Sequence, residues 1–241
     1  MTQYKLPHQR TFFSTYGFTL IEMSIVLVII GLVIGGALAG KAMIETAKFR
    51  ELTTDAVQMQ TRINTYIDKF GFYPGDHPEA ASFWPATDNG DGDGMVDYNE
   101  RHDVWQQMAL SGILEGSYTG NGSGGARIGI NQPPAPPPNS GYGLRWHANV
   151  FGRPGTFLEI GGQHATGYDV LGEPIFTPIE LFGMDKKFDD GDPQTGEIVA
   201  RHALTTTQGG ASNACLTTYS AGGTYRLDIT LKGCRIFFWQ D

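Results

Sequence analysis

Gly17-Phe18-Thr19-Leu20-Ile21-Glu22 begins the stretch that decides the fold, and a nearly unbroken apolar run follows it to Gly40. Between Phe18 and Gly40, Glu22 is the only ionisable side chain. As a helix, the run is long enough to cross the hydrocarbon core of a bilayer. A lone carboxylate in such a helix costs on the order of a few kcal/mol, so we expect Glu22 to have a partner.

A cut between Gly17 and Phe18 would supply that partner. It would create an α-amino group on Phe18, four residues before Glu22, and this amine is positively charged near neutral pH. In a stack of identical helices, the amine of one chain can reach the carboxylate of a neighbour that is shifted along the axis. The sequence therefore indicates that cleavage creates the cation that Glu22 needs.

This pattern, with a short basic leader before it and an apolar helix after it, resembles the class III signal of type IV prepilins and type II secretion pseudopilins. In that family, prepilin peptidase cuts after the glycine and methylates the new N-terminal phenylalanine. The glutamate at the fifth mature position then guides docking into a helical filament. The resemblance implies that Gly17 and Phe18 form the cleavage and methylation site and that Glu22 has the assembly role.

The same resemblance implies the partners and the location of the chain. The partners are prepilin peptidase, other pilin or pseudopilin subunits and the inner membrane. The chain would cross that membrane once, with its C-terminal head in the periplasm, and would reach the filament or cell surface after assembly. Because Lys41, Lys48 and Arg50 follow the apolar run, the positive-inside rule decides little. The orientation is taken from the peptidase, which acts on the cytoplasmic side.

Three alternatives explain the apolar run without a filament. An ordinary secretory signal could be cut near Gly36-Ala37-Leu38-Ala39, but it would need neither Glu22 nor the Gly-Phe junction. A plain single-span anchor and a buried helix of a soluble protein are the other two.

We predict three parts: a leader peptide at 1–17, a long helix at 18–70 with its transmembrane half at 18–40, and a globular head at 71–241. Beyond the apolar run, apolar residues recur every three or four positions, which is typical of an amphipathic helix. They are Leu52, Ala56, Met59, Ile63, Ile67 and Phe70. One helix over this range would be roughly 80 Å long. The resemblance implies an α+β, pilin-like fold in which this helix packs on a small antiparallel-sheet head with loop insertions.

The charge of the chain disfavours a nucleic-acid surface. The 241 residues carry a net charge of −8, with 17 basic and 25 acidic side chains. The leader contributes only Lys5 and Arg10, so the mature chain would have 15 basic and 25 acidic side chains, a net charge of −10. Phosphate binding needs clustered Lys and Arg, so we expect no nucleic-acid partner.

The second informative stretch is Asn89 to Glu100, N-G-D-G-D-G-M-V-D-Y-N-E. It aligns with the twelve-residue calcium loop of an EF-hand. The ligand positions hold Asn89, Asp91, Asp93, Met95 (through its carbonyl), Asp97 and Glu100. Position 1 is Asn89 rather than the usual Asp, and Asp88 beside it could replace it by a register shift. We predict a structural Ca²⁺ site with a Kd of roughly 10⁻⁴ to 10⁻³ M. A solvated Asp/Gly turn is the alternative.

The rest of the head is expected to alternate short elements with loops. We predict a short helix within 78–84, a helix from Glu100 to about Glu115 with Trp105 and Met108 in the core, and a helical turn at 179–184. The expected strands are 144–151, 156–160, 224–229 and 234–239. The proline-rich stretch 131–143 should be exposed polyproline, either a spacer loop or a partner-binding strip. The acidic segment 185–196 lacks a full ligand set at calcium spacing and is interpreted as a turn; whether it binds a second ion is left open.

The two cysteines, Cys215 and Cys234, are expected to form a disulfide if the chain is exported. Two buried thiols are the alternative. The closed loop of about twenty residues would stabilise the fold by roughly 3 kcal/mol. The sequence shows no catalytic motif, and its six histidines are scattered, so we predict no enzyme.

We therefore predict a structural, minor or specialised subunit of a type IV pilus or a type II secretion pseudopilus. One alternative is a membrane-anchored extracytoplasmic calcium-binding module. Another is an adhesin or secreted enzyme that uses the leader without joining a filament.

Overall fold

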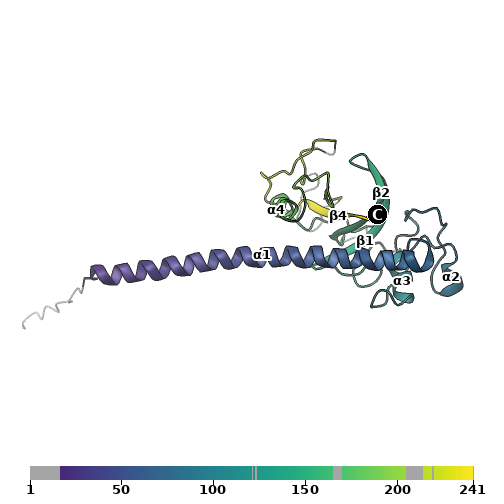
Figure 1. Ribbon diagram of the computed structural model, residues 1–241, viewed down its shortest axis with the longest axis horizontal. Helices are drawn as coiled ribbons and strands as arrows, with labels where there is room; N and C mark the ends of the chain where they lie inside the picture. The colour runs from purple at the N-terminus through teal and green to yellow at the C-terminus, as the bar shows by residue number, and fades with distance from the viewer. Residues whose placement is uncertain are drawn as a thin grey trace, which may run out of the picture. The chain divides into compact units, whose positions relative to one another are not determined.

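The structure is a computed structural model that describes residues 17–120, 122, 124–164, 170–204, 214–218 and 220–240. The chain divides into two compact units, residues 1–47 and 48–241. Helix α1 (Leu20–Phe70) contributes to both units and is the longest element labelled in Figure 1. The predicted long N-terminal helix is confirmed, and it begins at Leu20 rather than at Phe18.

In the first unit, α1 exposes apolar side chains all around its circumference. Leu20, Leu32 and Leu38, for example, are 89%, 73% and 66% exposed. By length and composition, this part of α1 is apolar enough to cross a membrane. A helix that is apolar on every side and has no protein cover needs an apolar environment. It therefore fits a single-pass membrane anchor.

In the second unit, the remainder of α1 buries one stripe of side chains in the core. The buried residues are Leu52, Ala56, Met59, Ile63 and Tyr66. Ile67 and Phe70 of the predicted stripe are half-buried against the same core. The predicted stripe left out Tyr66, which has a polar hydroxyl. In the structure Tyr66 is buried, and its hydroxyl donates a hydrogen bond to the buried Gln107 (3.1 Å).

A four-stranded antiparallel sheet packs on this stripe. Its strands are β1 (Ser140–Val150), β2 (Arg153–Gly162), β3 (Ile198–His202) and β4 (Cys234–Gln240), in the order β1-β2-β4-β3. Leu144, Leu158 and Phe238 belong to the core cluster that contains the α1 stripe. Alternate residues face the other side of the sheet, because successive side chains of a strand point in opposite directions. A long apolar helix followed by a small antiparallel sheet is an α+β, pilin-like architecture.

The strands predicted at 144–151, 156–160 and 234–239 are confirmed with small changes at their ends, but the strand predicted at 224–229 is wrong. That segment forms a single bridge, Leu216 to Tyr225, and then turns tightly, with Leu227 N bonded to Tyr225 O (3.1 Å). The place beside β4 is taken by β3, whose residues are almost all buried. The prediction missed β3 because five residues are too few to show a clear alternation.

Three shorter helices complete the described fold. They are α2 (Ala80–Phe83), α3 (Asp103–Leu110) and α4 (Pro178–Phe188). Trp105 and Met108 of α3 are fully buried, as predicted. However, α3 is shorter than the predicted 100–115, because Gly112 adopts a positive φ of 75° just after the helix.

The prediction of exposed polyproline at 131–143 is wrong at both ends. Asn131 and Gln132 are buried, and Gln132 accepts a hydrogen bond from the indole of Trp105 (2.8 Å). At the other end, Ser140 already begins β1. Only the middle of the stretch remains on the surface.

Loops of the same chain contact both edges of the sheet. On β1, the N–H groups of Tyr142 and Trp146 donate to the carbonyls of Pro133 (2.9 Å) and Val96 (2.7 Å). On β3, the N–H of Ala200 donates to Pro193 O (2.9 Å), and that of Ile198 donates to a carboxylate oxygen of Asp189 (2.7 Å).

Candidate functional site

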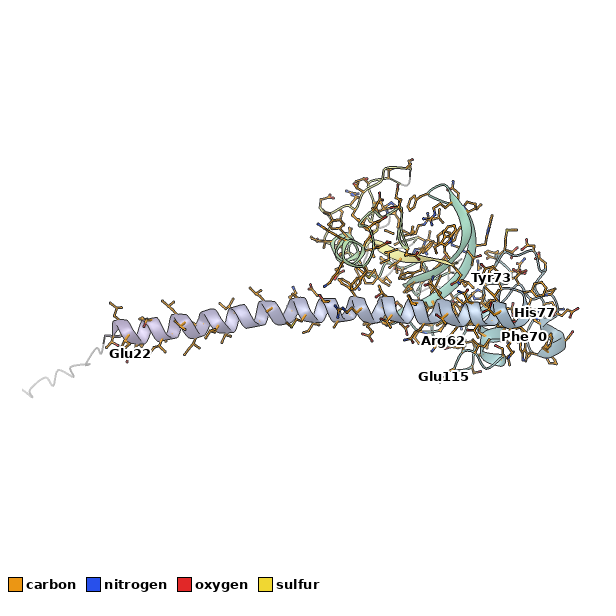
Figure 2. All side chains as sticks on the ribbon, in the orientation of Figure 1. Glu22, Arg62, Phe70, Tyr73, His77 and Glu115 are labelled. Atoms are coloured by element: carbon orange, nitrogen blue, oxygen red, sulfur yellow. A yellow bond between two sulfur atoms is a disulfide. The ribbon has the colours of Figure 1, made fainter. Side chains whose placement is uncertain are left out.

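The N-terminal site is a short non-helical segment, Gly17 to Thr19, followed by the first turn of α1. The N–H and hydroxyl of Thr19 both donate to Glu22 Oε2 (2.7 and 2.8 Å), and the N–H of Glu22 donates to Thr19 Oγ1 (3.2 Å). This reciprocal pair is a capping box, which stabilises the start of a helix. Figure 2 shows Glu22 at this end of α1. The peptide bond between Gly17 and Phe18 therefore lies outside the helix.

In the described part of the uncut chain, Glu22 has Thr19 as its partner and no cation. Its carboxylate is exposed on an otherwise apolar surface. Residues 1–16 of the predicted leader lie outside the described residues, and the boundaries predicted for the leader and the head remain predictions.

Comparison with known protein families agrees with this reading of the N-terminus. A family model described as "Prokaryotic N-terminal methylation motif" matches residues 14–38. The chain thus carries the prepilin-type cleavage and methylation signature, which contains Gly17, Phe18 and Glu22. No curated protein and no solved structure matches the chain. The signature indicates a subunit of the pilin or pseudopilin type, which a peptidase processes and which assembles with other pilin subunits.

A second candidate site lies in the head, where the acidic loop 89–100 meets the turn at Asp76. Asp76 is fully buried, and its carboxylate accepts three backbone N–H groups of the loop. They belong to Gly92 (2.6 Å), Asp93 (3.1 Å) and Gly94 (2.9 Å). The two segments touch so closely that a Cβ on Gly90 would lie 2.4 Å from the Cα of Asp76. Only glycine fits at position 90.

Three carboxylates gather at this contact. One oxygen each of Asp76, Asp91 and Asp93 lies within 4.8 Å of the others. Asp91 and Asp93 are exposed, and each uses one oxygen to accept an N–H two residues further along the loop. The other oxygen of each is available for a ligand. Oxygen atoms at this spacing fit Ca²⁺, which takes six to eight oxygen ligands at 2.3–2.6 Å.

The structure places the other predicted ligands differently. Asn89 accepts the N–H of Ala81 (2.8 Å) and so caps the start of α2. Glu100 turns toward the loop backbone, where it accepts the N–H groups of Asp91 (3.0 Å) and Asp97 (3.2 Å). Asp97 accepts the N–H of Asn99 (3.0 Å). The metal ligand set as a whole remains a prediction.

Sequence reasoning missed Asp76. It lies thirteen residues before Asn89, outside the twelve-residue pattern, and it comes to the loop only through the fold. The nearest sequence signal is the turn Tyr73-Pro74-Gly75-Asp76 directly after α1, which marks the end of the helix but does not indicate the contact with the loop. Figure 2 shows Phe70, Tyr73 and His77 in this region.

Burial and like charges make this site electrostatically unfavourable for carboxylates alone. Burial raises the pKa of Asp76, and the neighbouring Asp93 and Asp91 raise it further, whereas the hydrogen bonds from Gly94 and Gly92 lower it. Burial likewise raises the pKa of Glu100 to about 7. A cation at this position would relieve the repulsion.

The acidic segment 185–196 was predicted as a turn, but residues 185–188 form the last turn of α4, and only 189–196 form a turn after it. Asp185 is fully buried and accepts the hydroxyl of Tyr225 (2.6 Å) and the N–H of Gly191 (2.9 Å). Burial raises the pKa of Asp185 to about 6. Asp185, Asp189 and Asp190 also lie within 4.8 Å of one another, but the hydrogen bonds of Asp185 and Asp189 account for the fold of the turn.

The predicted disulfide is confirmed: Cys215 and Cys234 are bonded. Both residues are fully buried. The bond attaches the loop at 214–218 to the first residue of β4, which lies in the middle of the sheet.

Proposed function

We propose that this chain is a structural subunit of a type IV pilus or a type II secretion pseudopilus. Prepilin peptidase cuts it after Gly17 and methylates Phe18. The apolar half of α1 then passes from the inner membrane into a helical filament, and the head lies in the periplasm or on the cell surface. The long loops of the head favour a minor or specialised subunit over an abundant one.

One observation carries this proposal: the cleavage and methylation signature at 14–38 spans the Gly17–Phe18 junction and the start of α1, where the helix is apolar on every side except at Glu22. Glu22 lies in the first turn of α1, where it forms a capping box with Thr19. After cleavage, the new amine of Phe18 would lie at the same end of the helix. A charged amine beside the carboxylate lowers the cost of keeping Glu22 in hydrocarbon. In a filament, that amine can come from a neighbouring copy.

Mass spectrometry of the mature N-terminus tests the processing step. We expect an N-methylated Phe18 when the chain is produced together with a prepilin peptidase, and an uncut chain without the peptidase. Retention of Met1 under both conditions, or cleavage near Gly36, would instead support an ordinary anchor or a secretory signal.

Replacing Glu22 with glutamine tests the assembly step. We expect cleavage to continue but incorporation into filaments to fall, because the neutral amide cannot form an ion pair with the charged Phe18 amine. Glu45→Gln is the matched control, since Glu45 is an exposed carboxylate further along α1 that pairs with Lys41 of the same chain (3.9 Å). Equal incorporation of both variants would refute the assembly role of Glu22.

We also propose that loop 89–100 binds Ca²⁺ and that Asp76 is one of its ligands, together with Asp91 and Asp93. The calcium-loop spacing of the sequence and the clustering of these three carboxylates support the proposal. Ca²⁺, when bound, would supply positive charge and cross-link the loop to the turn that follows α1. The ion would have a structural role, since the loop has no second EF-hand partner in the sequence.

Calorimetric titration of the mature chain with CaCl₂ tests this site. We expect binding with a Kd of roughly 10⁻⁴ to 10⁻³ M and a rise in the Tm of the head. Asp93→Asn should abolish both effects, and Asp228→Asn, an exposed aspartate elsewhere on the head, should preserve them. Absence of binding heat and of a thermal shift at 10-fold higher calcium than the expected Kd would refute the metal site.

A further inference from the structure

A groove of about 490 Å³ lies beside α4, which is labelled in Figure 1, and we call it the α4 groove. Three segments line it: Phe182 of α4, the turn 190–193 and the loop 222–227. Phe182 is half-buried, its ring centre lies 5.6 Å from that of Tyr225, and Leu227 is 48% exposed. The groove therefore has an apolar, largely aromatic lining.

The side chain of Gln194 connects the two loop walls of the α4 groove. Gln194 is buried, and its Nε2 donates to Ser220 O (2.9 Å). Its Oε1 accepts the N–H groups of Gly222 (2.9 Å) and Gly223 (3.3 Å). Because these bonds hold the walls in place, the groove is preformed, and a ligand would not have to order it.

Two exposed carboxylates, those of Asp190 and Asp192, lie at the rim of the α4 groove. Asp190 accepts hydrogen bonds from Asp192 N (2.8 Å) and Thr195 Oγ1, and Asp192 accepts one from Gln194 N (3.0 Å). All these donors belong to the same turn. Within the described residues, neither carboxylate pairs with a cation.

The electrostatic field in the groove is negative. Burial raises the pKa of the Tyr225 hydroxyl, and Asp185, Asp190 and Asp192 raise it further. One oxygen each of Asp185, Asp189 and Asp190 lies within 4.8 Å of the others. Aromatic rings and carboxylates both attract positive charge, and an apolar lining covers an aliphatic stem. The α4 groove therefore fits a cation that ends a long side chain.

The nearby cations of the same chain do not neutralise the rim. Lys186 Nζ lies 5.8 Å from the ring centre of Phe182, and within the described residues it forms no ion pair. Arg226 pairs with Asp228 (3.4 Å). The position of Lys186 shows that the Phe182 ring accepts a cation, while the carboxylates remain available to another molecule.

The head-bearing part of α1 presents a suitable cation to other molecules. Arg50 is exposed and forms no ion pair within the part of the chain that the structure describes. It is followed at helical spacing by three more exposed residues, Thr54, Val57 and Thr61. This side of α1 points away from the buried stripe that begins at Leu52, so Arg50 does not face its own head.

The place of Arg50 along the helix also suits a second copy as the partner. In the proposed filament the apolar halves of α1 pack together, so the residues that follow them come close to the heads of neighbouring copies. Two other bases lie in this region. Lys41 pairs with Glu45 (3.9 Å), and Lys48 precedes Leu52 by one helical turn, on the side of its own head.

We propose that the α4 groove of one copy of this chain receives Arg50 of a second copy. The planar guanidinium would stack on Phe182 and donate hydrogen bonds to Asp190 and Asp192. Because the groove and Arg50 belong to different surfaces, the contact is head-to-tail and builds a helical filament unless the rotation closes a ring. The inference rests on the proposed filament function and names the side chains through which a head recognises the helix of the next copy.

Zero-length cross-linking of the assembled full chain tests this contact. Arg50→Lys keeps the positive charge and provides an amine that a carbodiimide joins to a carboxylate in contact with it. Assemblies are prepared from equal amounts of ¹⁵N-labelled and unlabelled chain, so that mass spectrometry distinguishes links between copies from links within one. We expect mixed-isotope links from position 50 to Asp190 or Asp192, with a yield that falls as salt is added.

Charge reversal provides a second measurement. Arg50→Glu should reduce incorporation into assemblies by about tenfold, because it places like charges together, and Asp192→Lys in the same chain should restore it. Lys69→Glu is the matched control, since Lys69 is an exposed base near the other end of α1, and this variant should assemble normally. Thermal unfolding of each variant is measured in parallel, and where a variant fails to fold, the cross-linking result decides.

The outcomes separate this inference from the proposed function. If the wild-type chain assembles in a Glu22-dependent way but position 50 forms no link to Asp190 or Asp192 between copies, the inference is refuted and the filament function stands. Links from position 50 to residues 88–97 would assign Arg50 to the other acidic loop and also refute it. If the processed wild-type chain forms no assemblies, the filament function fails, and this inference fails with it.

Discussion

Replacing Asp76 with alanine removes the side chain that organises loop 89–100. The change deletes three hydrogen bonds from Gly92, Asp93 and Gly94 to a charged acceptor. Such bonds contribute about 1.5–3 kcal/mol each. The three N–H groups are only partly buried, so water can replace some of the lost bonds, and the change also removes repulsion from Asp91 and Asp93. We expect a net loss of about 2–4 kcal/mol in the free energy of unfolding.

For a folded region of this size, that loss corresponds to a fall of about 5–15 °C in Tm. The assay is thermal unfolding of the mature chain in detergent micelles, followed by tryptophan fluorescence in the presence of a chelator, so that calcium does not contribute. Asn89→Ala is the comparison, because Asn89 accepts only one hydrogen bond, from Ala81. It should cost about 0.5–1.5 kcal/mol.

Asp76→Asn should fall between these two variants, because the amide keeps one acceptor oxygen. The reasoning is refuted if Asn89→Ala lowers the Tm as much as Asp76→Ala does. In that case the first residue of the sequence pattern would organise the loop, and the buried carboxylate would be incidental.

Two further predictions concern the C-terminal part of the head. Replacing Cys215 and Cys234 together with alanine should lower the stability by about 3 kcal/mol, and a reducing agent should destabilise the wild-type chain but not this variant. His202 accepts the N–H of Cys215 through Nδ1 (3.1 Å), and burial together with Arg201, Arg226 and Arg235 lowers its pKa to about 4. Because the unfolded chain takes up this proton first, the stabilising contribution is complete above about pH 6.5 and is lost as the pH falls toward 4. Wild-type Tm should therefore fall more steeply over this range than the Tm of His202→Asn, which keeps an acceptor but does not titrate; parallel curves would contradict the assigned pKa.

The sequence predicted α1 because two local patterns define it. An uninterrupted apolar run needs only length to indicate a membrane helix, and the stripe from Leu52 to Phe70 has the helical period. β4 and the β1–β2 pair were also predictable, since Gly152 separates two apolar alternating segments and Cys234 begins a third. These elements depend on residues close together in the chain.

The errors arose where contacts between distant residues decide the structure. β3 is a strand because both of its faces are covered, and five residues cannot show this in the sequence. The segment 224–229 has strand-like composition, but the disulfide and the bond from Arg226 N to Cys215 O (2.9 Å) hold it as a loop. Asp76 reaches the acidic loop only because Gly90 permits the two backbones to touch.

The loop contacts on β1 and β3 affect how copies of this chain can associate when they are crowded in a membrane. Copies of such a chain diffuse in one plane at high local concentration, and an exposed strand edge there would template stacking of sheets from many copies. Here the carbonyls of Val96, Pro133 and Pro193 already accept hydrogen bonds from backbone N–H groups of the two edge strands, β1 and β3. Because these donors are occupied, pairing of edge strands from two copies is blocked at these positions, which protects the head against cross-β stacking.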